Sequence, residues 1–457
     1  MASEIEAKLG LRSSAESIEM GKALRAQTPR ASHAGWRPAP DRRDPMDILE
    51  ESNRGRVPEL IPIRHGRMLA NPFAFLRGSA AVMAADLAAT PASGIRVQVC
   101  GDCHLANFGL FATPERNLVF DINDFDETLP APWEWDVKRL AASFVVAGRE
   151  NSIPDRDCEA AVRVLSRSYR AHLREYAEMR VLDVWYARID EKTLIATAPD
   201  AAARRRRQRI AAKARASLAE YLFPKISGVV DGRRRLVDQP PLIFHLPGQS
   251  GEAERLKPIL AAYHDTLPAD RRQLFERYRL VDFAFKAVGV GSVGTHCFVL
   301  LFLAGEDDPL LLQAKEAGES VLAPYAGQSS FEHQGQRIVV GQRLMQSASD
   351  MFLGWTTGAD GRHFYLRQLR DMKFSLPLVN LEAVVLARYA DICAWALARA
   401  HAKGGDAAMI SGYLGQTDAF DQALAKFALA YADQTERDHA ALVAATRSGR
   451  VQAVVDK

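Results

Sequence analysis

Residues 280–317 read LVDFAFKAVGVGSVGTHCFVLLFLAGEDDPLLLQAKEA, and this stretch decides the fold class. Three runs of aliphatic, aromatic and β-branched residues are separated by a glycine-rich loop and by a turn at EDD. This pattern predicts three antiparallel strands joined by hairpin turns. Further along, residues 332–349 favour a helix, and MFLGWTT and HFYLRQLRD flank a GADG turn that predicts another hairpin. We therefore expect an antiparallel sheet with one helix over residues 280–372.

The glycine-rich loop has the sequence GVGSVG, with glycines that let backbone N–H groups approach phosphates. The same G-x-G-x-x-G pattern occurs in dinucleotide-binding folds, but there the loop opens a helix. Here the strand-like run THCFVLLFLAG follows, and strand–loop–strand is the arrangement found in kinases. The candidate phosphate-binding positions are Gly289, Gly291, Ser292 and Gly294.

Lys315 lies on the next predicted strand, one hairpin beyond the glycine-rich loop. Burying a lysine at the end of an apolar strand is costly unless it is paired. It is either a surface lysine at a strand end or the lysine that binds nucleotide phosphates in a kinase. Kinases supply a glutamate partner from the following helix, for which Glu319 and Glu332 are candidates. The helix-like run QRIVVGQRLMQSASD, however, contains no acid before Asp350.

Most candidate catalytic residues lie in the segment CGDCHLANFGLFATPERNLVFDINDFDETLPAPWEWD, residues 100–136. Short strands are predicted at residues 95–100 and 117–122. Acidic and amide side chains come at or after the ends of both strands: Asp102, Asn107, Asp121, Asp124 and Asp126. Magnesium prefers hard oxygen ligands, and a nearby carboxylate can accept the proton of an attacking hydroxyl. Asp and Asn also form turns, but two strands that deliver acids to one end favour a metal site.

These loops resemble the catalytic and metal-binding loops of aminoglycoside phosphotransferases and choline kinases. That family has a Gly-Asp-x-His-x-x-Asn loop, a strand, an Asp-aromatic-acid turn, and Asp-Leu-Ala at a helix start. Residues 101–107 match the loop, 124–126 the turn and 136–141 the helix start. The resemblance implies that Asp102 is the base and that Asn107 and Asp124 are metal ligands.

The same resemblance implies that Asp136 braces the catalytic loop. Asp121 is a competing metal ligand, because it ends its predicted strand more directly than Asp124 does. The choice between these two aspartates stays open from sequence.

The order of the motifs differs from that of ordinary kinases, in which the glycine-rich loop and its lysine precede the catalytic loop. Here they follow it by roughly two hundred residues. We therefore expect an α+β, protein-kinase-like, two-lobed fold in circularly permuted order, with a small antiparallel sheet lobe and a larger helical lobe. Permutation is tolerated where termini lie close together on the surface. The run DICAWALARAHAKGGD resembles the helix that normally precedes the catalytic loop.

The chain also resembles the DUF2252 family of bacterial proteins of unknown function. The likeness covers roughly residues 55–445 and is carried by NPFAFLRG, GDCHLANFG, FDINDFDE, WEWDVKRLAAS, GVGSVGT, QAKEA, GQRLMQ, YLRQLRDMK and ARAHAKGGDA. It implies a family but no substrate.

The expected organisation has five parts. Residues 1–55, rich in charge, Ser and Pro, are expected to form a loosely ordered arm. Residues 56–150 form the catalytic and metal-loop half of the helical lobe, and 151–279 a helical insertion and connector. Residues 280–373 form the sheet lobe, and 374–457 are C-terminal helices that complete the helical lobe.

Bulk composition points to an ordinary globular protein of 457 residues, 48% hydrophobic, with a formal net charge of +3. This charge gives no strong case for nucleic acid or a membrane as partner. No run approaches the roughly 18 apolar residues that span a bilayer. The polar N-terminal stretch lacks a signal h-region, and the odd count of five cysteines fits reduced thiols, so we expect a cytoplasmic protein.

Several motifs have competing interpretations. The pattern C-x-x-C-H at residues 100–104 matches haem attachment, but that chemistry requires export, and a structural zinc lacks a second ligand pair. The arginine run at 204–207 fits a solvated helix face better than a nucleic-acid or acidic partner. Arg64, Arg67 and Arg77 bind phosphate or brace carboxylates, and the sequence does not choose between these roles.

The predicted function is an ATP- and Mg²⁺-dependent phosphotransferase whose partners are a nucleotide and an unidentified hydroxyl acceptor. Asp102 and His104 are the catalytic candidates. One alternative is a metal-dependent phosphoesterase that uses these two residues with Asp121 and Asp124. Another is a protein that binds nucleotide without catalysis.

Overall fold

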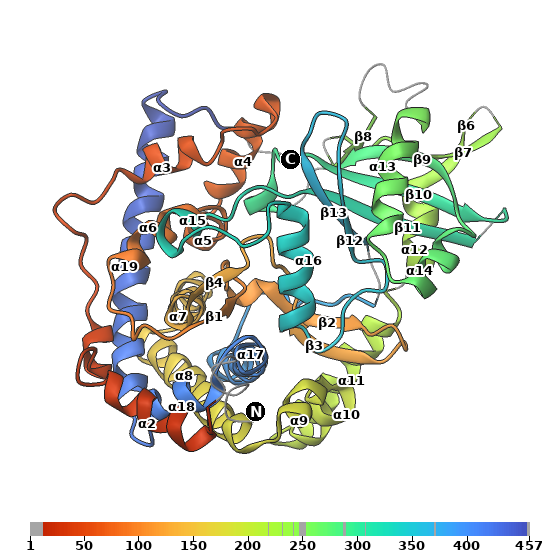
Figure 1. Ribbon diagram of the computed structural model, residues 1–457. Coiled ribbons are helices and arrows are strands. Elements are labelled where there is room, and N and C mark those ends of the chain that lie inside the picture. The colour runs from red at the N-terminus through yellow and green to blue at the C-terminus, as the bar shows by residue number, and fades with distance from the viewer. Residues whose placement is uncertain are drawn as a thin grey trace.

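Six antiparallel strands form the largest sheet, in the order β12-β13-β11-β10-β9-β8. Their bounds are β8 Ile243–Phe244, β9 Arg279–Lys286, β10 Cys297–Ala304, β11 Asp308–Glu316, β12 Gly354–Thr357 and β13 His363–Gln368. The helix expected at 332–349 is α16 (Gln334–Met345), which lies between this sheet and the rest of the molecule (Figure 1). The predicted sheet, its hairpins and its helix are therefore confirmed.

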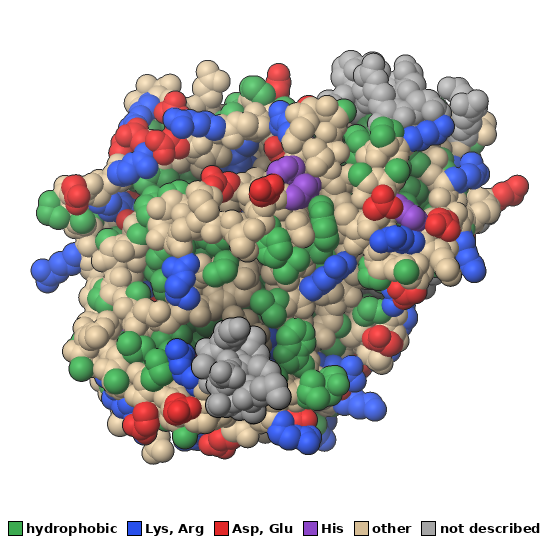
Figure 2. Space-filling view, in the orientation of Figure 1, with side chains coloured by type: hydrophobic (Ala, Val, Ile, Leu, Met, Phe, Trp, Pro, Cys, Tyr) green, Lys and Arg blue, Asp and Glu red, His purple; other side chains and the backbone are tan. Residues whose placement is uncertain are grey.

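These coordinates come from a computed structural model, which describes residues 12–454 except 218, 231, 241, 246–252, 287–288, 307 and 370–371. The chain is a mixed helix-and-strand protein with several small antiparallel sheets. Among the described residues, no helix combines the length and the apolar character needed to cross a bilayer. Acidic and basic side chains are interspersed on the face shown in Figure 2.

Both faces of the large sheet are covered, because successive side chains along a strand point to opposite faces. On one face, Leu300 and Phe302 pack with Tyr263 and Phe275. On the other face, Leu301 packs in a second cluster with residues of the segment 223–243. The covering elements are α12 (Ala219–Ile226), α13 (Ala253–Asp265), α14 (Ala269–Phe275) and the hairpin of β6 (Ser227–Val230) and β7 (Arg233–Leu236).

The helical body is built around long helices that pack side by side (Figure 1). They are α7 (Trp133–Glu150), α8 (Asp155–Glu178), α17 (Ala383–Gly404), α18 (Ala407–Leu414) and α19 (Ala419–Arg447). The helices expected near 133–149, 381–402 and 420–445 are thereby confirmed. Within the segment 151–279, α8 packs on α17, while α12 and α13 pack on the sheet.

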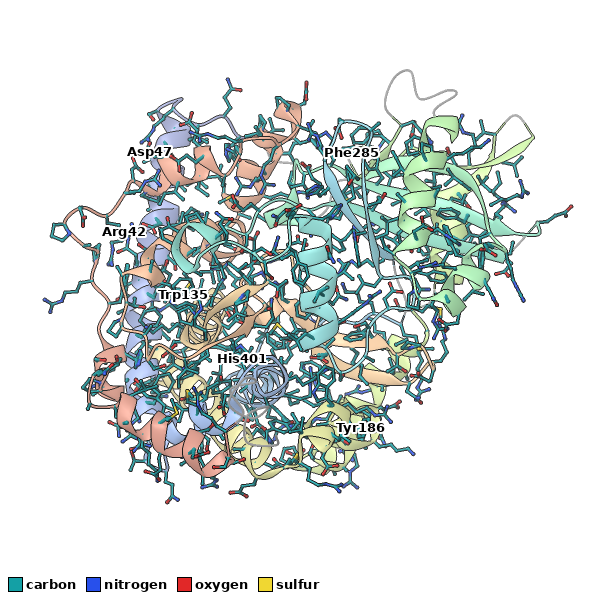
Figure 3. All side chains as sticks on the ribbon, viewed as in Figure 1. Arg42, Asp47, Trp135, Tyr186, Phe285 and His401 are labelled. Carbon is teal, nitrogen blue, oxygen red and sulfur yellow. The ribbon has the colours of Figure 1, made fainter. Side chains whose placement is uncertain are left out.

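The described part of the N-terminal segment is packed, which corrects the expectation of a loosely ordered arm. Helix α2 (Ser14–Leu24) lies so close to α18 that a Cβ on Gly21 would come 2.0 Å from Met409 O. Arg42, labelled in Figure 3, pairs with Asp86 at 2.7 Å and with Asp438 at 2.6 Å. Residues 1–11 lie outside the described part of the chain.

Two short strand pairs present the loops of the acidic segment. β1 (Arg96–Val99) pairs with β4 (Leu129–Pro132), and β2 (Phe108–Ala112) pairs with β3 (Leu118–Ile122). The strands expected at 95–100 and 117–122 are confirmed as β1 and β3. The remaining elements are α3 (Pro45–Glu51), α4 (Ile61–Met68), α5 (Pro72–Gly78), α6 (Ala80–Ala88), α9 (Val181–Tyr186), β5 (Ile189–Asp190), α10 (Glu191–Ala196), α11 (Ala201–Arg215), α15 (Ala323–Ala326) and the 3₁₀ turns η1 (Arg30–Ala34), η2 (Pro58–Leu60), η3 (Leu105–Asn107) and η4 (Val290–Ser292).

Candidate functional site

A cavity of about 940 Å³ brings together the loop after β1, the turn after β3, the glycine-rich loop and the end of β11. The sequence candidates that line it are Asp102, His104, Asn107, Asp124, Gly289, Gly291 and Lys315. Segments that lie far apart in the chain therefore share one polar chamber. Asp121 and Gly294, which the structure describes, are not among the lining residues.

The loop after β1, residues 100–107, is held in place by Asp136, at the start of α7. Its carboxylate accepts hydrogen bonds from the backbone N–H groups of Cys100 at 2.8 Å and Gly101 at 3.0 Å. Gly101 has φ +85°, and a Cβ there would lie 2.3 Å from Glu127 O, so only glycine fits between the loop and the acidic turn. His401 of α17 lies 3.2 Å from Asp136. Asp136 is thus placed as the brace that the resemblance implied.

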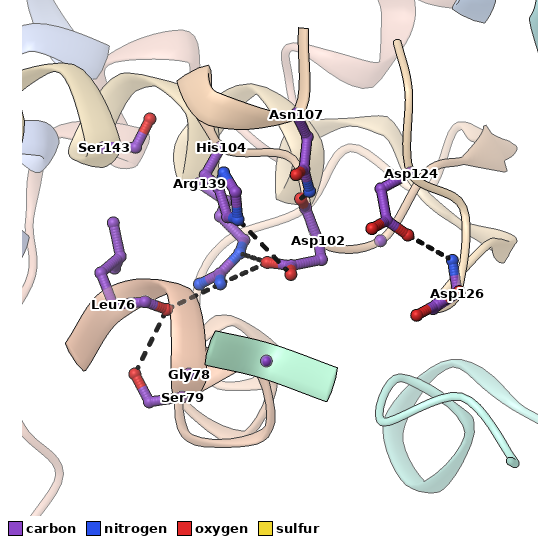
Figure 4. A network of polar contacts seen from close by, with 12 residues as sticks. Leu76, Gly78, Ser79, Asp102, His104, Asn107, Asp124, Asp126, Arg139 and Ser143 are labelled. Atoms are coloured by element: carbon purple, nitrogen blue, oxygen red, sulfur yellow. Dashed lines mark hydrogen bonds and ion pairs between the residues drawn. The ribbon is translucent and has the colours of Figure 1, made fainter. Parts of the chain in front are cut away.

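Asp102 is paired with a buried arginine that follows Asp136 by one helical turn. Arg139 donates from Nε to Asp102 Oδ1 at 2.6 Å and from Nη2 to the carbonyl of Leu76 at 2.9 Å. The other carboxylate oxygen, Oδ2, lies 3.7 Å from His104 Nε2 (Figure 4). One oxygen of Asp102 is therefore oriented by Arg139, while the side chain lines the cavity.

His104 is a neutral ring at physiological pH. Burial lowers the pKa of His104 to about 4, and the charge of Asp102 opposes this effect only in part. Its ring packs edge-on against Phe73, with centroids 6.2 Å apart. His104 therefore lines the cavity beside Asp102 as a neutral imidazole and not as a protonated general acid.

Asn107 and Asp124 offer the oxygen atoms that a hard cation needs. The Asn107 side chain donates from Nδ2 to Asp102 O at 2.9 Å, which leaves Oδ1 as the atom presented to a cation. Burial alone would raise the pKa of Asp124, but Lys315, Arg367 and Lys373 together lower it to about 2. Asp124 is therefore ionised throughout the neutral range. Figure 4 shows the side chains of Asp102, Asn107 and Asp124 at neighbouring positions.

Lys315 reaches from the sheet to the acidic turn. It forms an ion pair with Asp126, and its Nζ lies 3.8 Å from Asp124 Oδ2. Burial would lower the pKa of Lys315, but the two aspartates raise it well above its ordinary value. Tyr365 donates to the other oxygen of Asp126 at 2.7 Å. The partner that the sequence left open is thus supplied by the acidic turn, and neither Glu319 nor Glu332 is needed for it.

Helix α16 contributes an arginine where an acid was expected. Arg337 donates to the carbonyl oxygens of Asp126 at 2.8 Å, Thr128 at 2.6 Å and Gly318 at 2.8 Å. These bonds fix the backbone of the acidic turn against the sheet side of the cavity. A helix rich in Gln and Arg gives no local signal for this role, because its partners lie up to 211 residues away.

Asp121 has a structural role that corrects its place as a competing metal ligand. It is 0% exposed, and both carboxylate oxygens accept from Arg399 Nη2 at 2.8 Å. One oxygen also accepts from the backbone N–H and the hydroxyl of Ser347, each at 2.8 Å. A carboxylate with these partners, outside the cavity, is not available to a metal ion there.

The glycine-rich loop is attached to the segment that precedes α4. Arg56 donates to the carbonyls of Val293 at 2.6 Å and Gly291 at 3.0 Å, and Val57 N donates to Gly294 O at 2.7 Å. Gly294 has φ +88°, a conformation that favours glycine, and this glycine allows the chain to turn at the end of the loop. Sequence analysis missed Arg56 because its contacts span about 235 residues. It also missed Arg139, although the i to i+3 spacing from Asp136 places the two on one helix face.

A second group of possible ligands lies under the catalytic loop. Sulfur atoms of Cys100 and Cys103 and a carboxylate oxygen of Asp136 lie within 4.8 Å of one another. Burial raises the pKa of both thiols, and the Asp136 oxygens already accept N–H groups of the loop. In this structure the group packs under the loop and supports it.

The fold and site together define a mixed α/β protein with a deep, highly charged chamber between a helical body and an antiparallel sheet. Residues 56–445 match the family described as "Uncharacterized protein conserved in bacteria (DUF2252)". The chain belongs to the DUF2252 family. Comparisons with curated proteins and with solved structures find no match.

We predict that replacing Asp121 lowers the free energy of unfolding more than replacing Asp124 does. Asp121→Asn leaves the Arg399 guanidinium buried without a counter-ion and should lower the free energy of unfolding by about 3–5 kcal/mol. Asp124→Asn leaves Lys315 paired with Asp126 and should lower the free energy of unfolding by no more than about 2 kcal/mol, the size that the lowered pKa of Asp124 implies. Denaturant unfolding measures both. The double variant Asp121→Asn with Arg399→Met should recover part of the loss, and equal effects of the two single variants would contradict the assignment.

We predict a pH-dependent contribution from Glu127, which lines the cavity. Burial raises the pKa of its carboxyl from 4.5 to about 7, despite the N–H of Val321 and the charge of Arg337. The folded state therefore holds a proton that the unfolded state loses, and stability falls as pH rises from about 4.5 to about 7. Relative to wild type, Glu127→Gln should gain about 3 kcal/mol across that window and then level off. Unfolding midpoints at several pH values test this, and a constant difference would refute it.

Proposed function

We propose that the protein is an ATP- and Mg²⁺-dependent phosphotransferase with a circularly permuted, kinase-like fold. One observation carries the proposal: Lys315, which follows a glycine-rich loop on the sheet, lies 3.8 Å from Asp124 in the cavity that Asp102 and Asn107 also line. Phosphoryl transfer needs phosphate-binding donors, metal-binding oxygens and a proton acceptor at one place. The acceptor in this proposal is an unidentified hydroxyl.

Magnesium fits the donor set on the acidic side of the cavity. Asn107 Oδ1 and the Asp124 carboxylate are hard oxygen donors on adjacent loops, and few protein ligands suit an ion that also binds phosphate oxygens and water. When bound, the ion would neutralise phosphate charge. Asp102, oriented by Arg139, would accept the hydroxyl proton of the acceptor.

The ion pair between Lys315 and the acidic turn has a direct functional meaning under this proposal. Lysine and aspartate neutralise each other in the cavity, so neither charge is buried alone. A nucleotide with its metal ion offers each group a new partner, with phosphate oxygens for Lys315 and the cation for Asp124. Ligand binding would then replace the attraction between Lys315 and Asp124 by two others, between Lys315 and phosphate and between Asp124 and the cation.

The contacts of α17 support the permuted order. A Cβ on Gly404 would lie 2.9 Å from Gln98 Cβ, and one on Gly405 would lie 2.3 Å from Val97 Cγ1. The end of α17 therefore abuts β1, immediately ahead of the catalytic loop in space, although it follows that loop by some three hundred residues in the chain. A helix at this position next to β1 is what a circularly permuted, kinase-like fold would require, which supports the proposal.

The phosphoesterase alternative has less support. It requires Asp121 as a ligand and His104 as an acid or base, but Asp121 is committed to Arg399 and the pKa of His104 is lowered to about 4. A protein that binds nucleotide without catalysis would share the cavity and differ only in turnover.

The nucleotide-binding half of the proposal is tested with Lys315→Met. Because a ligand stabilises the state that binds it, Mg²⁺ with ATP should raise the thermal midpoint of the wild type, and the variant should lose that increase. Lys192→Met, an exposed lysine on α10, is the control and should respond like the wild type. A variant at Lys315 that keeps the full nucleotide-induced shift would count against the kinase-like site.

The catalytic half is tested with Asp102→Asn. This change keeps the shape of the side chain but removes its proton acceptor, so turnover of ATP, with water or an added hydroxyl as acceptor, should fall about 10²–10⁴-fold. Nucleotide affinity should stay within about threefold, since base catalysis acts mainly in the transition state. Asp124→Asn should instead weaken Mg²⁺-dependent nucleotide binding. Loss of affinity alone in Asp102→Asn would identify that residue as a ligand and not as the base.

A further inference from the structure

Arg77 lies directly beneath the glycine-rich loop, on the last turn of α5. A Cβ on Gly291 would come 3.1 Å from Arg77 O, and a Cβ on Gly289 would come 3.7 Å from Arg77 Nη2. The guanidinium also lines the cavity with Asp102 and Asp124. Position 289 of the glycine-rich loop therefore lies within van der Waals reach of this guanidinium.

The charge of Arg77 is poorly compensated. Its Nε is buried and has no hydrogen-bond partner, and burial lowers the pKa of the guanidinium while Asp102 and Asp124 oppose this effect only in part. Those two carboxylates have other close cations, Arg139 for Asp102 and Lys315 for Asp124. A partly buried cation in this situation gains most from an anion that enters the cavity.

Arg64 also lines the cavity and also has a buried Nε without a hydrogen-bond partner, so the two arginines differ only in their terminal nitrogens. The Nη2 of Arg64 donates to the carbonyl of Gly78 at 2.8 Å and its Nη1 to Asn53. It holds the end of α5 in place. Of the two arginines, Arg64 therefore supports the helix and Arg77 faces the space between the glycine-rich loop and the catalytic loop.

We propose that Arg77 and the Gly289–Gly291 backbone form a binding site for the terminal phosphate of a nucleoside triphosphate. This inference rests on the proposed function and deepens it. Backbone N–H groups of a glycine-rich loop and a planar guanidinium both suit phosphate oxygens. The position between Gly289 and Asp102 is the one that the transferred phosphoryl group would occupy, between donor and proton acceptor.

In the transfer step, the acceptor oxygen forms a bond to the terminal phosphorus while the bond from that phosphorus to the bridging oxygen breaks. The electron pair of the broken bond goes to the nucleoside diphosphate, and the acceptor proton goes to Asp102. Arg77 takes part in no bond change. It supplies positive charge to the equatorial oxygens of the phosphoryl group, which is where charge resides in the transition state.

The test compares ATP, ADP, and ADP with beryllium fluoride as a terminal-phosphate mimic, all with Mg²⁺, by calorimetry. Arg77→Met should weaken ATP and the ADP–beryllium fluoride complex about 10–100-fold, the effect of losing a charge-assisted hydrogen bond. ADP affinity should change less than about twofold, which also shows that the variant is folded. The ATP affinity of Arg77→Lys should fall between those of the wild type and Arg77→Met. Arg205→Met, which changes an exposed arginine on α11, should bind all three ligands like the wild type.

The outcomes separate this inference from the proposed function. A wild type that binds none of the three ligands would overturn the proposed function and the Arg77 site with it. A wild type that binds them, with Arg77→Met weakening ATP and ADP equally or neither, would overturn the Arg77 site alone. Selective loss of ATP and of the beryllium fluoride complex supports it.

Discussion

The ion pair between Lys315 and Asp126 is the interaction on which the arrangement of the site depends. Lys315 is 3% exposed, and a buried ammonium requires an anion within reach. Its partner is 189 residues away in the chain, so the pair joins the large sheet to the acidic turn of the helical body. Tyr365 and Arg337 hold the same turn from the sheet side, through its carboxylate and its carbonyls. The cavity lies between the large sheet and the helical body, and this ion pair joins the two.

The acidic residues of the segment divide into those that hold the structure and those that face the cavity. Asp121 and Asp136 are sealed in the interior, where Arg399 and His401 of α17 contact them. Asp102 and Asp124 line the cavity. The division has an energetic basis, because a buried carboxylate is tolerated only with full compensation, and such a residue has no capacity left for a ligand. One helix, α17, therefore contacts the interior acid of each loop, while Asp102 and Asp124 face the cavity.

Local patterns sufficed for the hairpins and the long helices, because strand and helix periodicity is written within short windows. That Asp102, Asn107 and Lys315 share one cavity was expected from the resemblance to kinase motifs and not from periodicity. Local patterns could not decide whether Asp121 or Asp124 faces the cavity. That choice depends on Arg399, which lies 278 residues from Asp121. The packing of residues 12–55 was missed for the same reason, since a polar segment reads as loose unless its distant partners, such as Asp438 for Arg42, are known.

The support of the glycine-rich loop follows from the order of the chain. Arg56 and Arg77 both contact this loop, and the chain that carries them continues through α5, α6 and β1 into the catalytic loop. Arg139 links the two ends of this segment, because it donates hydrogen bonds to the carbonyl of Leu76, next to Arg77, and to the carboxylate of Asp102. The glycine-rich loop and the catalytic loop therefore rest on one packed segment, residues 56–102, and not only on the sheet. The distance between the two loops therefore depends on how the helices of that segment pack, and a close-packed interior has low compressibility.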